Sequence, residues 1–112
     1  MSYDIALYLK VDTGRPEPID YCAANIGNYT ANVSGMWADA LGYWLADLNG
    51  RTAGDCIDDL KRAVDDMEQR PHHYRAMNPA NGWGNYEGAL EYLRELLIAC
   101  CAHPKAEIHI SH

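Results

Sequence analysis

Residues 3–11 read YDIALYLKV, and apolar side chains alternate along this segment with a period of two. Tyr, Ile, Leu, Leu and Val occupy the odd positions, whereas Asp, Ala, Tyr and Lys occupy the even ones. This alternation predicts a β-strand with one buried face. The tail repeats the pattern, since Ala106, Ile108 and Ile110 fall on one face of another predicted strand. We expect these two terminal strands to pair in one small sheet.

A turn and a weaker strand follow the first strand. Residues 12–16, DTGRP, have the Gly and Pro content that is typical of a turn. Residues 18–24 place apolar side chains at alternate positions, which predicts a further strand. The next segment, residues 25–32 (NIGNYTAN), is rich in Asn and is predicted to be a loop.

Two helices are predicted in the first half of the chain. The first is short: Asn32 or Ser34 caps it, and it ends near Gly42. The second begins at residues 52–55, TAGD, which resemble a capping box with Asp in the third place, and it ends at Pro71. Its apolar positions follow a helical period and are Cys56, Ile57, Leu60, Ala63, Val64 and Met67.

Two further helices are predicted in the second half. A short one covers residues 72–77, and the longest runs from Tyr86 to about Ala102, with Asn85 placed to cap it. The prediction for residues 1–112 is therefore a single α+β domain. Three to four helices should cover a small antiparallel or mixed sheet of two to three strands.

Charge and hydropathy exclude several classes of partner. The net charge of −7 opposes direct contact with nucleic acid or anionic lipid, because both need clusters of Lys and Arg. No apolar run approaches the length of a membrane span, and residues 1–5 lack the basic and apolar segments of a signal peptide. We therefore expect a cytoplasmic protein. The four cysteines lack framework spacing, so we expect free thiols packed as small apolar groups.

No catalytic or metal-binding pattern stands out. His72 and His73 are adjacent, so on a helix they point about 100° apart and cannot chelate one ion. Cys100 and His103 lie at a predicted helix C-terminus, where the helix dipole disfavours a thiolate. We expect no catalytic residue, no metal and no cofactor. An enzyme that uses Asp or His stays the least supported hypothesis.

Six of the seven asparagines lie in two windows, residues 25–32 and 78–85, and both windows also hold Gly and an aromatic residue. Amide side chains donate and accept hydrogen bonds without charge, which suits the recognition of a polar ligand or of an exposed backbone. Turn formation is the alternative interpretation, and Asn32 and Asn85 are expected to serve as caps. The predicted binding residues are Asn28, Tyr29, Thr30, Trp37, Asn81, Trp83 and Tyr86.

Acidic residues crowd the polar face of the helix that begins at residues 52–55. They are Asp55, Asp58, Asp59, Asp65, Asp66 and Glu68. Such a face is usually only solvated, and the alternative is a docking surface for a basic partner. Asp58 and Arg62 have the spacing of a stabilising i,i+4 pair. Glu87, Glu91 and Glu95 form a like-charged stripe on the longest helix.

Two segments resemble small hypothetical proteins of actinobacteria and their phages. They are GNYTANVSGMW at residues 27–37 and NPANGWGNYEGALEYL at residues 78–93. The similarity extends over the whole length and includes the opening Tyr3-Asp4-Ile5. The resemblance implies a phage or prophage setting, but it supplies no established activity and no catalytic residue.

The leading hypothesis is a non-enzymatic cytoplasmic recognition or accessory protein, phage-encoded if the resemblance holds. It would bind a protein partner through the two Asn-rich loops and the acidic helix faces. The alternative is a small-molecule binder that uses the same loops as a pocket for a nucleotide or a sugar. The sequence does not set the oligomeric state.

Overall fold

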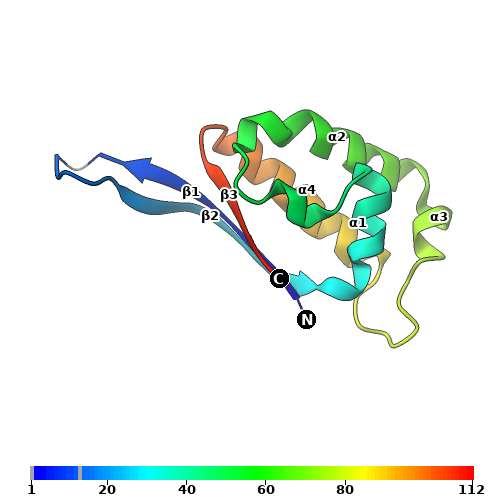
Figure 1. The fold of residues 1–112 in the computed structure, drawn as a ribbon. Helices are drawn as coiled ribbons and strands as arrows, with labels where there is room; N and C mark the ends of the chain where they lie inside the picture. Colours follow the sequence, from blue (N-terminus) through cyan, green and yellow to red (C-terminus); the bar gives the residue numbers. More distant parts are fainter. Residues whose placement is uncertain (1, 13) are drawn as a thin grey trace.

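Three strands form one sheet, and the helices cover one of its faces (Figure 1). The computed structural model describes residues 2–12 and 14–112. In chain order the elements are β1 (Ser2–Val11), β2 (Ile19–Thr30), the 3-10 helix η1 (Ala31–Val33), α1 (Ser34–Leu41), the 3-10 helix η2 (Leu45–Leu48), α2 (Ala53–Gln69), α3 (Pro71–Arg75), α4 (Tyr86–Ala102) and β3 (Glu107–Ser111). The predicted α+β fold is confirmed.

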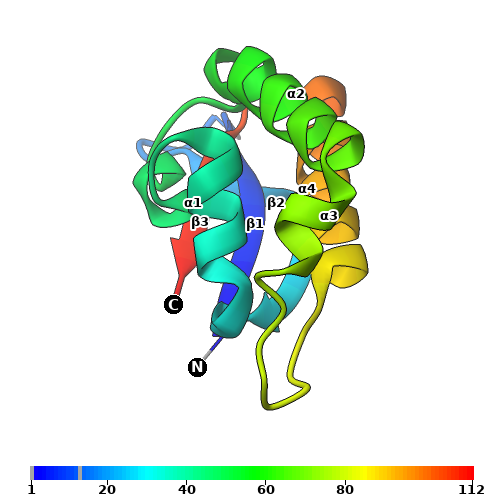
Figure 2. The same ribbon diagram turned by 90° about the vertical axis from the view of Figure 1, so that its right-hand side faces the viewer.

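The strand order is β2-β1-β3, with β1 antiparallel to both neighbours. The predicted pairing of the terminal strands is confirmed, since Ile5 lies opposite Ile110 and Leu7 lies opposite Ile108. The period of two in β1 turns Tyr3, Ile5 and Leu7 toward the helices, where all three are buried. Figure 2 shows the helices side by side over this face.

Strand β2 is longer than the sequence analysis predicted. The loop prediction for residues 25–32 is wrong over residues 25–30, which stay paired with β1. Two register shifts, opposite Ile5/Ala6 and Leu7/Tyr8, show where β2 accommodates extra residues. Gly27 lies at the first shift with a φ of 80°, a conformation that glycine adopts without a steric penalty. These irregularities let an Asn- and Gly-rich segment remain a strand.

One of the two helix-cap predictions is confirmed and the other is wrong. Neither Asn32 nor Ser34 caps a helix; the Thr30 side chain instead accepts a hydrogen bond from the Asn32 amide at 3.3 Å at the start of η1. Asn85 is the predicted cap of α4, and its side chain accepts from the Gly88 amide at 2.8 Å. The prediction is thus wrong for the short helix and confirmed for the long one.

The start of α2 is held by the end of the chain rather than by a capping box. Thr52 occupies the N-cap position, but its side chain makes no capping hydrogen bond. The Ala53 amide instead donates to the Ala106 carbonyl at 2.7 Å, and the Gly54 amide donates to the Pro104 carbonyl at 2.8 Å. The first turn of α2 therefore depends on the connection between α4 and β3.

The aromatic core gathers where α1 and α4 meet the sheet. Trp37 is fully buried, and its Nε1 donates to the Ala89 carbonyl at 3.0 Å. The Trp37 ring lies 5.4 Å from the Tyr3 ring and 5.6 Å from the Tyr92 ring. Tyr86 is also buried and donates its hydroxyl proton to the Met67 carbonyl at 2.6 Å.

The cysteines divide into two environments. All four are free thiols, as predicted, and Cys56 and Cys100 are buried. Cys22 and Cys101 are exposed, so the prediction that all four pack as small apolar groups is wrong. Among the described helices, none has both the length and the apolar character needed to cross a membrane.

We expect Trp37→Ala to lower the free energy of unfolding by about 3–5 kcal/mol, because the substitution leaves a large cavity in the core. Trp37→Phe should lower it by about 1–3 kcal/mol, because it removes the buried hydrogen bond from the indole Nε1 to the Ala89 carbonyl and part of the packed ring. Trp44→Ala is the matched control, since Trp44 is 57% exposed. Urea unfolding measures all three, and equal losses at positions 37 and 44 would contradict the assignment.

Candidate functional site

The two Asn-rich windows meet at one end of the sheet. The Asn85 amide donates to the Tyr29 hydroxyl at 3.1 Å, which joins the end of β2 to the start of α4. A Cβ built on Gly84 would lie 2.5 Å from Thr30 Cγ2, so the Gly84 backbone packs against the Thr30 side chain with no room for a side chain of its own. Gly88 faces the Tyr29 hydroxyl in the same way. These contacts fix the loop before α4 against the end of β2.

A surface hollow of about 690 Å³ lies between the two windows. Its lining residues are Ser2, Asn28, Tyr29, Thr30, Asn32, Asn81, Trp83 and Gly84. Five of the seven predicted binding residues are therefore brought together. Among the residues of the lining that the structure describes, none has a charged side chain.

Ser2, Asn32 and Gly84 also line the hollow, although Asn32 was expected to be a helix cap and the other two were not among the predicted binding residues. Ser2 lies opposite Thr30 in the ladder between β1 and β2. An antiparallel register for the two strands would have placed it beside the predicted site. Gly84 could have been found from the close backbone approach that a glycine permits.

Trp37 and Tyr86, the other two predicted binding residues, belong to the core. Both side chains are buried and hydrogen-bonded to backbone carbonyls, so neither ring is presented to a partner. Trp37 nevertheless supports the hollow from below, since its ring lies 6.2 Å from the ring of Tyr29. Its role in this structure is to position the site.

Trp83 is the most exposed large apolar side chain in the described part of the chain, with 69% of its surface accessible. Its backbone amide donates to the Asn81 side chain at 3.0 Å, a local turn that holds the loop. Asn78 similarly accepts from the Tyr86 amide at 2.8 Å. The loop that carries Trp83 is therefore braced on both sides.

The asparagines divide between turn formation and free surface. Asn25, Asn78, Asn81 and Asn85 each use a side-chain oxygen to accept a bond from a nearby backbone amide. Local turns at Asn25 and Asn81, the cap at Asn85 and the loop-closing bond of Asn78 thus account for four of the six. Asn28 and Asn32 are exposed, and within the described residues neither side chain makes a hydrogen bond. Their amides are free to meet a ligand.

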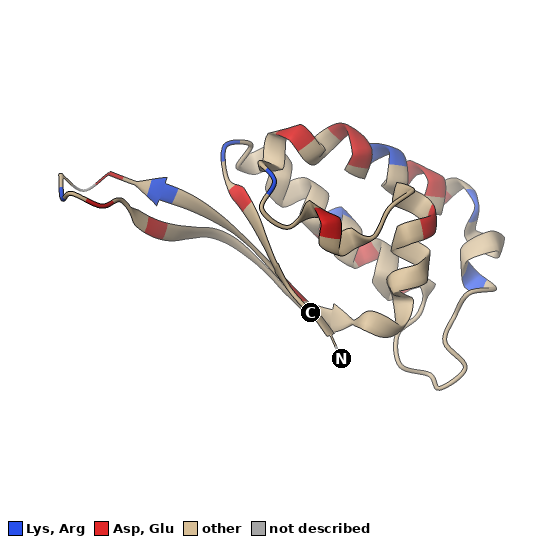
Figure 3. Cartoon of the chain, viewed as in Figure 1, with Lys and Arg blue, Asp and Glu red and all other residues tan. Residues whose placement is uncertain are grey.

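The acidic face of α2 lies on the opposite side of the helical part from the loop before α4. Figure 3 shows the red residues of α2 at the top, whereas the loop before α4 is uncoloured at the bottom. Arg62 pairs with Asp59 at 3.3 Å, so the predicted pair with Asp58 is wrong. On α4, Glu87 pairs with Arg75 at 3.1 Å and Glu91 pairs with Arg94 at 3.6 Å, which partly neutralises the predicted glutamate stripe.

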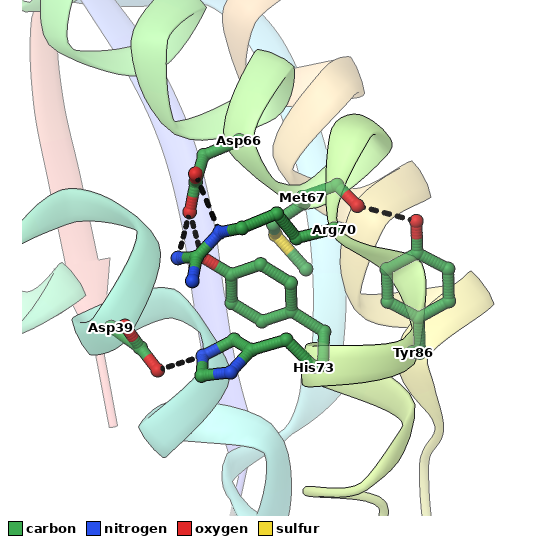
Figure 4. A network of polar contacts seen from close by, with 7 residues as sticks. Asp39, Asp66, Met67, Arg70, His73 and Tyr86 are labelled. Atoms are coloured by element: carbon green, nitrogen blue, oxygen red, sulfur yellow. Dashed lines mark hydrogen bonds and ion pairs between the residues drawn. The ribbon is translucent and has the colours of Figure 1, made fainter.

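A polar network ties α3 to its neighbours (Figure 4). Arg70 donates to both carboxylate oxygens of Asp66, at 2.9 Å and 2.6 Å, and the Tyr74 hydroxyl donates to the same carboxylate. His73 Nε2 lies 2.6 Å from Asp39 Oδ2 on α1. This His–Asp pair is largely exposed and does not line the hollow. Within the described residues, no group of three or more His, Cys, Asp or Glu side chains could hold a metal ion.

Comparison with known proteins finds no family model, no curated protein and no solved structure that matches the chain. The interpretation of the hollow therefore depends on its chemistry. That chemistry consists of uncharged amide and hydroxyl groups beside one exposed indole ring.

We expect Gly84→Ala to destabilise the protein by about 2–4 kcal/mol, because the residue combines a φ of 87° with contact against Thr30 and Val33. Gly82→Ala is the matched control: its φ is 76°, but a Cβ there meets nothing within 4 Å. Its loss should be about 1–2 kcal/mol. Urea unfolding of both variants checks the difference, and equal losses would argue against the close approach.

The polar network around Asp66 also predicts how the pKa of its carboxylate responds to substitution. The hydrogen bonds from Arg70, followed by the bond from Tyr74, lower the pKa of Asp66. Because the folded pKa lies below the ordinary value, the stabilisation is complete above the ordinary value and is lost as the pH falls through the folded pKa. Tyr74→Phe should raise the pKa of Asp66, and Arg70→Gln should raise it further.

Carboxyl NMR titration measures this pKa. Tyr43→Phe is the control, because Tyr43 donates to Asp59 rather than to Asp66. An Asp66 pKa that neither Tyr74→Phe nor Arg70→Gln changes would contradict the network.

Proposed function

We propose that this protein is a non-enzymatic recognition protein that binds another protein at the hollow between residues 28–32 and 81–84. The observation that carries the proposal is the meeting of the two Asn-rich windows around the exposed Trp83. Tryptophan is among the residues most enriched at the energetic centres of protein interfaces. An exposed indole surrounded by amide groups has the composition of such a centre.

The rigidity of the hollow supports the same proposal. Trp83 sits on a loop that Asn81, Gly84 and Asn85 hold in place, so little ordering entropy is lost when a partner binds. The free amides of Asn28 and Asn32 can pair with an exposed backbone, because each offers both a donor and an acceptor. The uncharged lining favours an apolar or neutral polar segment of the partner at this point.

The acidic face of α2 has a secondary role in the proposal. Asp55, Asp58 and Asp65 are exposed, and no ion pair involves them within the described residues. Because this face lies away from the hollow, we assign it to long-range attraction of a basic partner rather than to direct contact (Figure 3). The resemblance to small actinobacterial and phage proteins implies only a setting, so within the proposal the protein acts in the cytoplasm of a bacterial host.

A small-molecule ligand is the second candidate, and the size of the hollow favours it. A volume of about 690 Å³ lies within the range of ligand pockets. The described residues of the lining include no cationic side chain to meet a phosphate, so this lining suits a sugar better than a nucleotide. Trp83 would then stack on the ligand.

We expect the variant Asn28→Ala/Asn32→Ala/Trp83→Ala to lose capture of a specific partner in affinity purification from host lysate, with little change in Tm. Trp44→Ala is the matched control, since it removes an exposed indole away from the hollow and should leave capture intact. Mass spectrometry of the captured proteins provides the measurement.

The proposal is overturned if the triple variant captures the same partner as well as the wild type does. An equal fall in capture and in Tm would favour a purely structural role for these residues. A thermal-shift screen tests the second candidate: stabilisation by a sugar that Trp83→Ala removes would support it over the protein partner.

A further inference from the structure

Two of the seven asparagines precede a glycine: Asn49 in the connection before α2, and Asn81 in the loop before α4. Asparagine is thermolabile, and a following glycine has no side chain to hinder attack of its backbone nitrogen on the asparagine amide. Both dipeptides are exposed, and φ is 84° at Gly50 and 76° at Gly82. Sequence, exposure and glycine φ therefore do not separate the two sites, but their hydrogen bonds do.

Strand β3 holds Asn49 and Gly50 in place. The Asn49 side chain accepts a hydrogen bond from the Ile110 amide at 2.8 Å, and the Gly50 amide donates to the Ile108 carbonyl at 2.8 Å. The Ile108 amide donates in turn to the Arg51 carbonyl at 2.9 Å. Ring closure at Asn49 would use both its side-chain amide and the Gly50 nitrogen. It therefore requires this segment to separate from the sheet.

Asn81 and Gly82 are held only by their own loop. The Asn81 side chain accepts from the Trp83 amide at 3.0 Å, and the Gly82 amide donates to the Pro79 carbonyl at 3.3 Å. Within the described part of the chain, residues 79–82 make no hydrogen bond to any element outside this loop. The loop is braced at its two ends, and its tip projects from the helices (Figure 2). Local opening of such a tip costs less free energy than separation of a segment from a sheet.

The turn at Asn81 also favours the reaction itself. Attack by the Gly82 nitrogen on Asn81 Cγ places negative charge on Oδ1. The Trp83 amide already donates to this oxygen, and a donor aimed at a developing oxyanion stabilises it. Only the bond from Gly82 to the Pro79 carbonyl has to break before the nitrogen can attack.

We propose that Asn81 is a site of spontaneous deamidation, whereas the fold protects Asn49. Hydroxide removes the proton from the Gly82 nitrogen, and the nitrogen forms a bond to Asn81 Cγ. The bond from Cγ to Nδ2 breaks, and Nδ2 takes up a proton and leaves as ammonia. Water then opens the resulting succinimide at one of its two carbonyls, which gives aspartate or isoaspartate at position 81. No atom changes its oxidation state.

The product changes the chemistry of the hollow. A carboxylate enters a lining whose described residues carry no charge, and the chain gains one negative charge beyond −7. In isoaspartate the main chain runs through the former side chain, so the acceptor of the Trp83 amide moves and the exposed indole moves with it. Deamidation should therefore weaken binding of a neutral or apolar partner segment as the protein ages. That last effect rests on the proposed function, whereas the reaction at Asn81 does not.

Peptide mapping by mass spectrometry measures amide loss at both sites after incubation of the full chain at neutral and mildly alkaline pH, with digestion under acidic conditions. In the folded protein Asn81 should react more than about tenfold faster than Asn49, because Asn49 must first separate from β3. The rate at Asn81 should rise with pH, since the Gly82 nitrogen has to lose its proton. In urea above the unfolding transition the two rates should become similar.

Asn81→Gln is the matched variant, because Gln keeps the amide but would have to close a larger ring. It should abolish conversion at position 81 and leave the slow reaction of Asn49 unchanged. Equal rates at Asn81 and Asn49 in the folded chain would overturn the proposal. A rate difference that persists unchanged in urea would also overturn it, because the fold would then not be its cause.

The effect on the hollow has a readout of its own. The indole N–H resonance of Trp83 should shift on the time course of the conversion, whereas that of the buried Trp37 should stay in place. A Trp83 resonance that is unchanged in fully converted protein would contradict the effect. Freshly prepared, unconverted protein that captures no partner would count against the proposed function alone, since conversion is followed by mass.

Discussion

The hydrogen bond from Trp37 Nε1 to the Ala89 carbonyl joins α1 to α4 beneath the sheet, and the candidate site depends on it. The Trp37 ring packs against Tyr3 of β1, Tyr29 of β2 and Tyr92 of α4, while the Tyr92 hydroxyl donates to the Gly27 carbonyl at 2.8 Å. This aromatic cluster fixes the end of the sheet against the start of α4. Because Tyr29 belongs both to the cluster and to the lining of the hollow, the packing of the core sets the position of the surface.

The secondary-structure elements that could be predicted are those with a regular apolar periodicity within their own segment. The period of two in residues 3–11 identified β1, and the apolar period after Asn85 identified α4 together with its cap. The second half of β2 escaped prediction because Asn and Gly favour loops locally, whereas pairing with β1 overrides that preference. The site was found in part: Asn28 and Trp83 lie in the hollow, but Trp37 and Tyr86 are core residues. An aromatic residue close to an asparagine in the sequence can lie either in the hollow or in the core. Only tertiary packing decides between these two positions.

The surface separates an acidic face on α2 from the uncharged lining of the hollow. The carboxylates gather on α2, and several are held in ion pairs, such as Asp66 with Arg70. The described residues that line the hollow carry no charged side chain. In the proposal the carboxylates of α2 attract a basic partner over a distance, whereas uncharged groups at the hollow make the direct contact.

The account rests on the claim that the end of β2 and the loop before α4 form one fixed surface. Nuclear Overhauser effects from the Gly84 α-protons test this claim directly, because the structure sets Gly84 against the Thr30 and Val33 methyl groups. We predict strong effects to both methyl groups in the free protein. A spectrum without them, in which the loop around Trp83 moves independently of β2, would contradict the account.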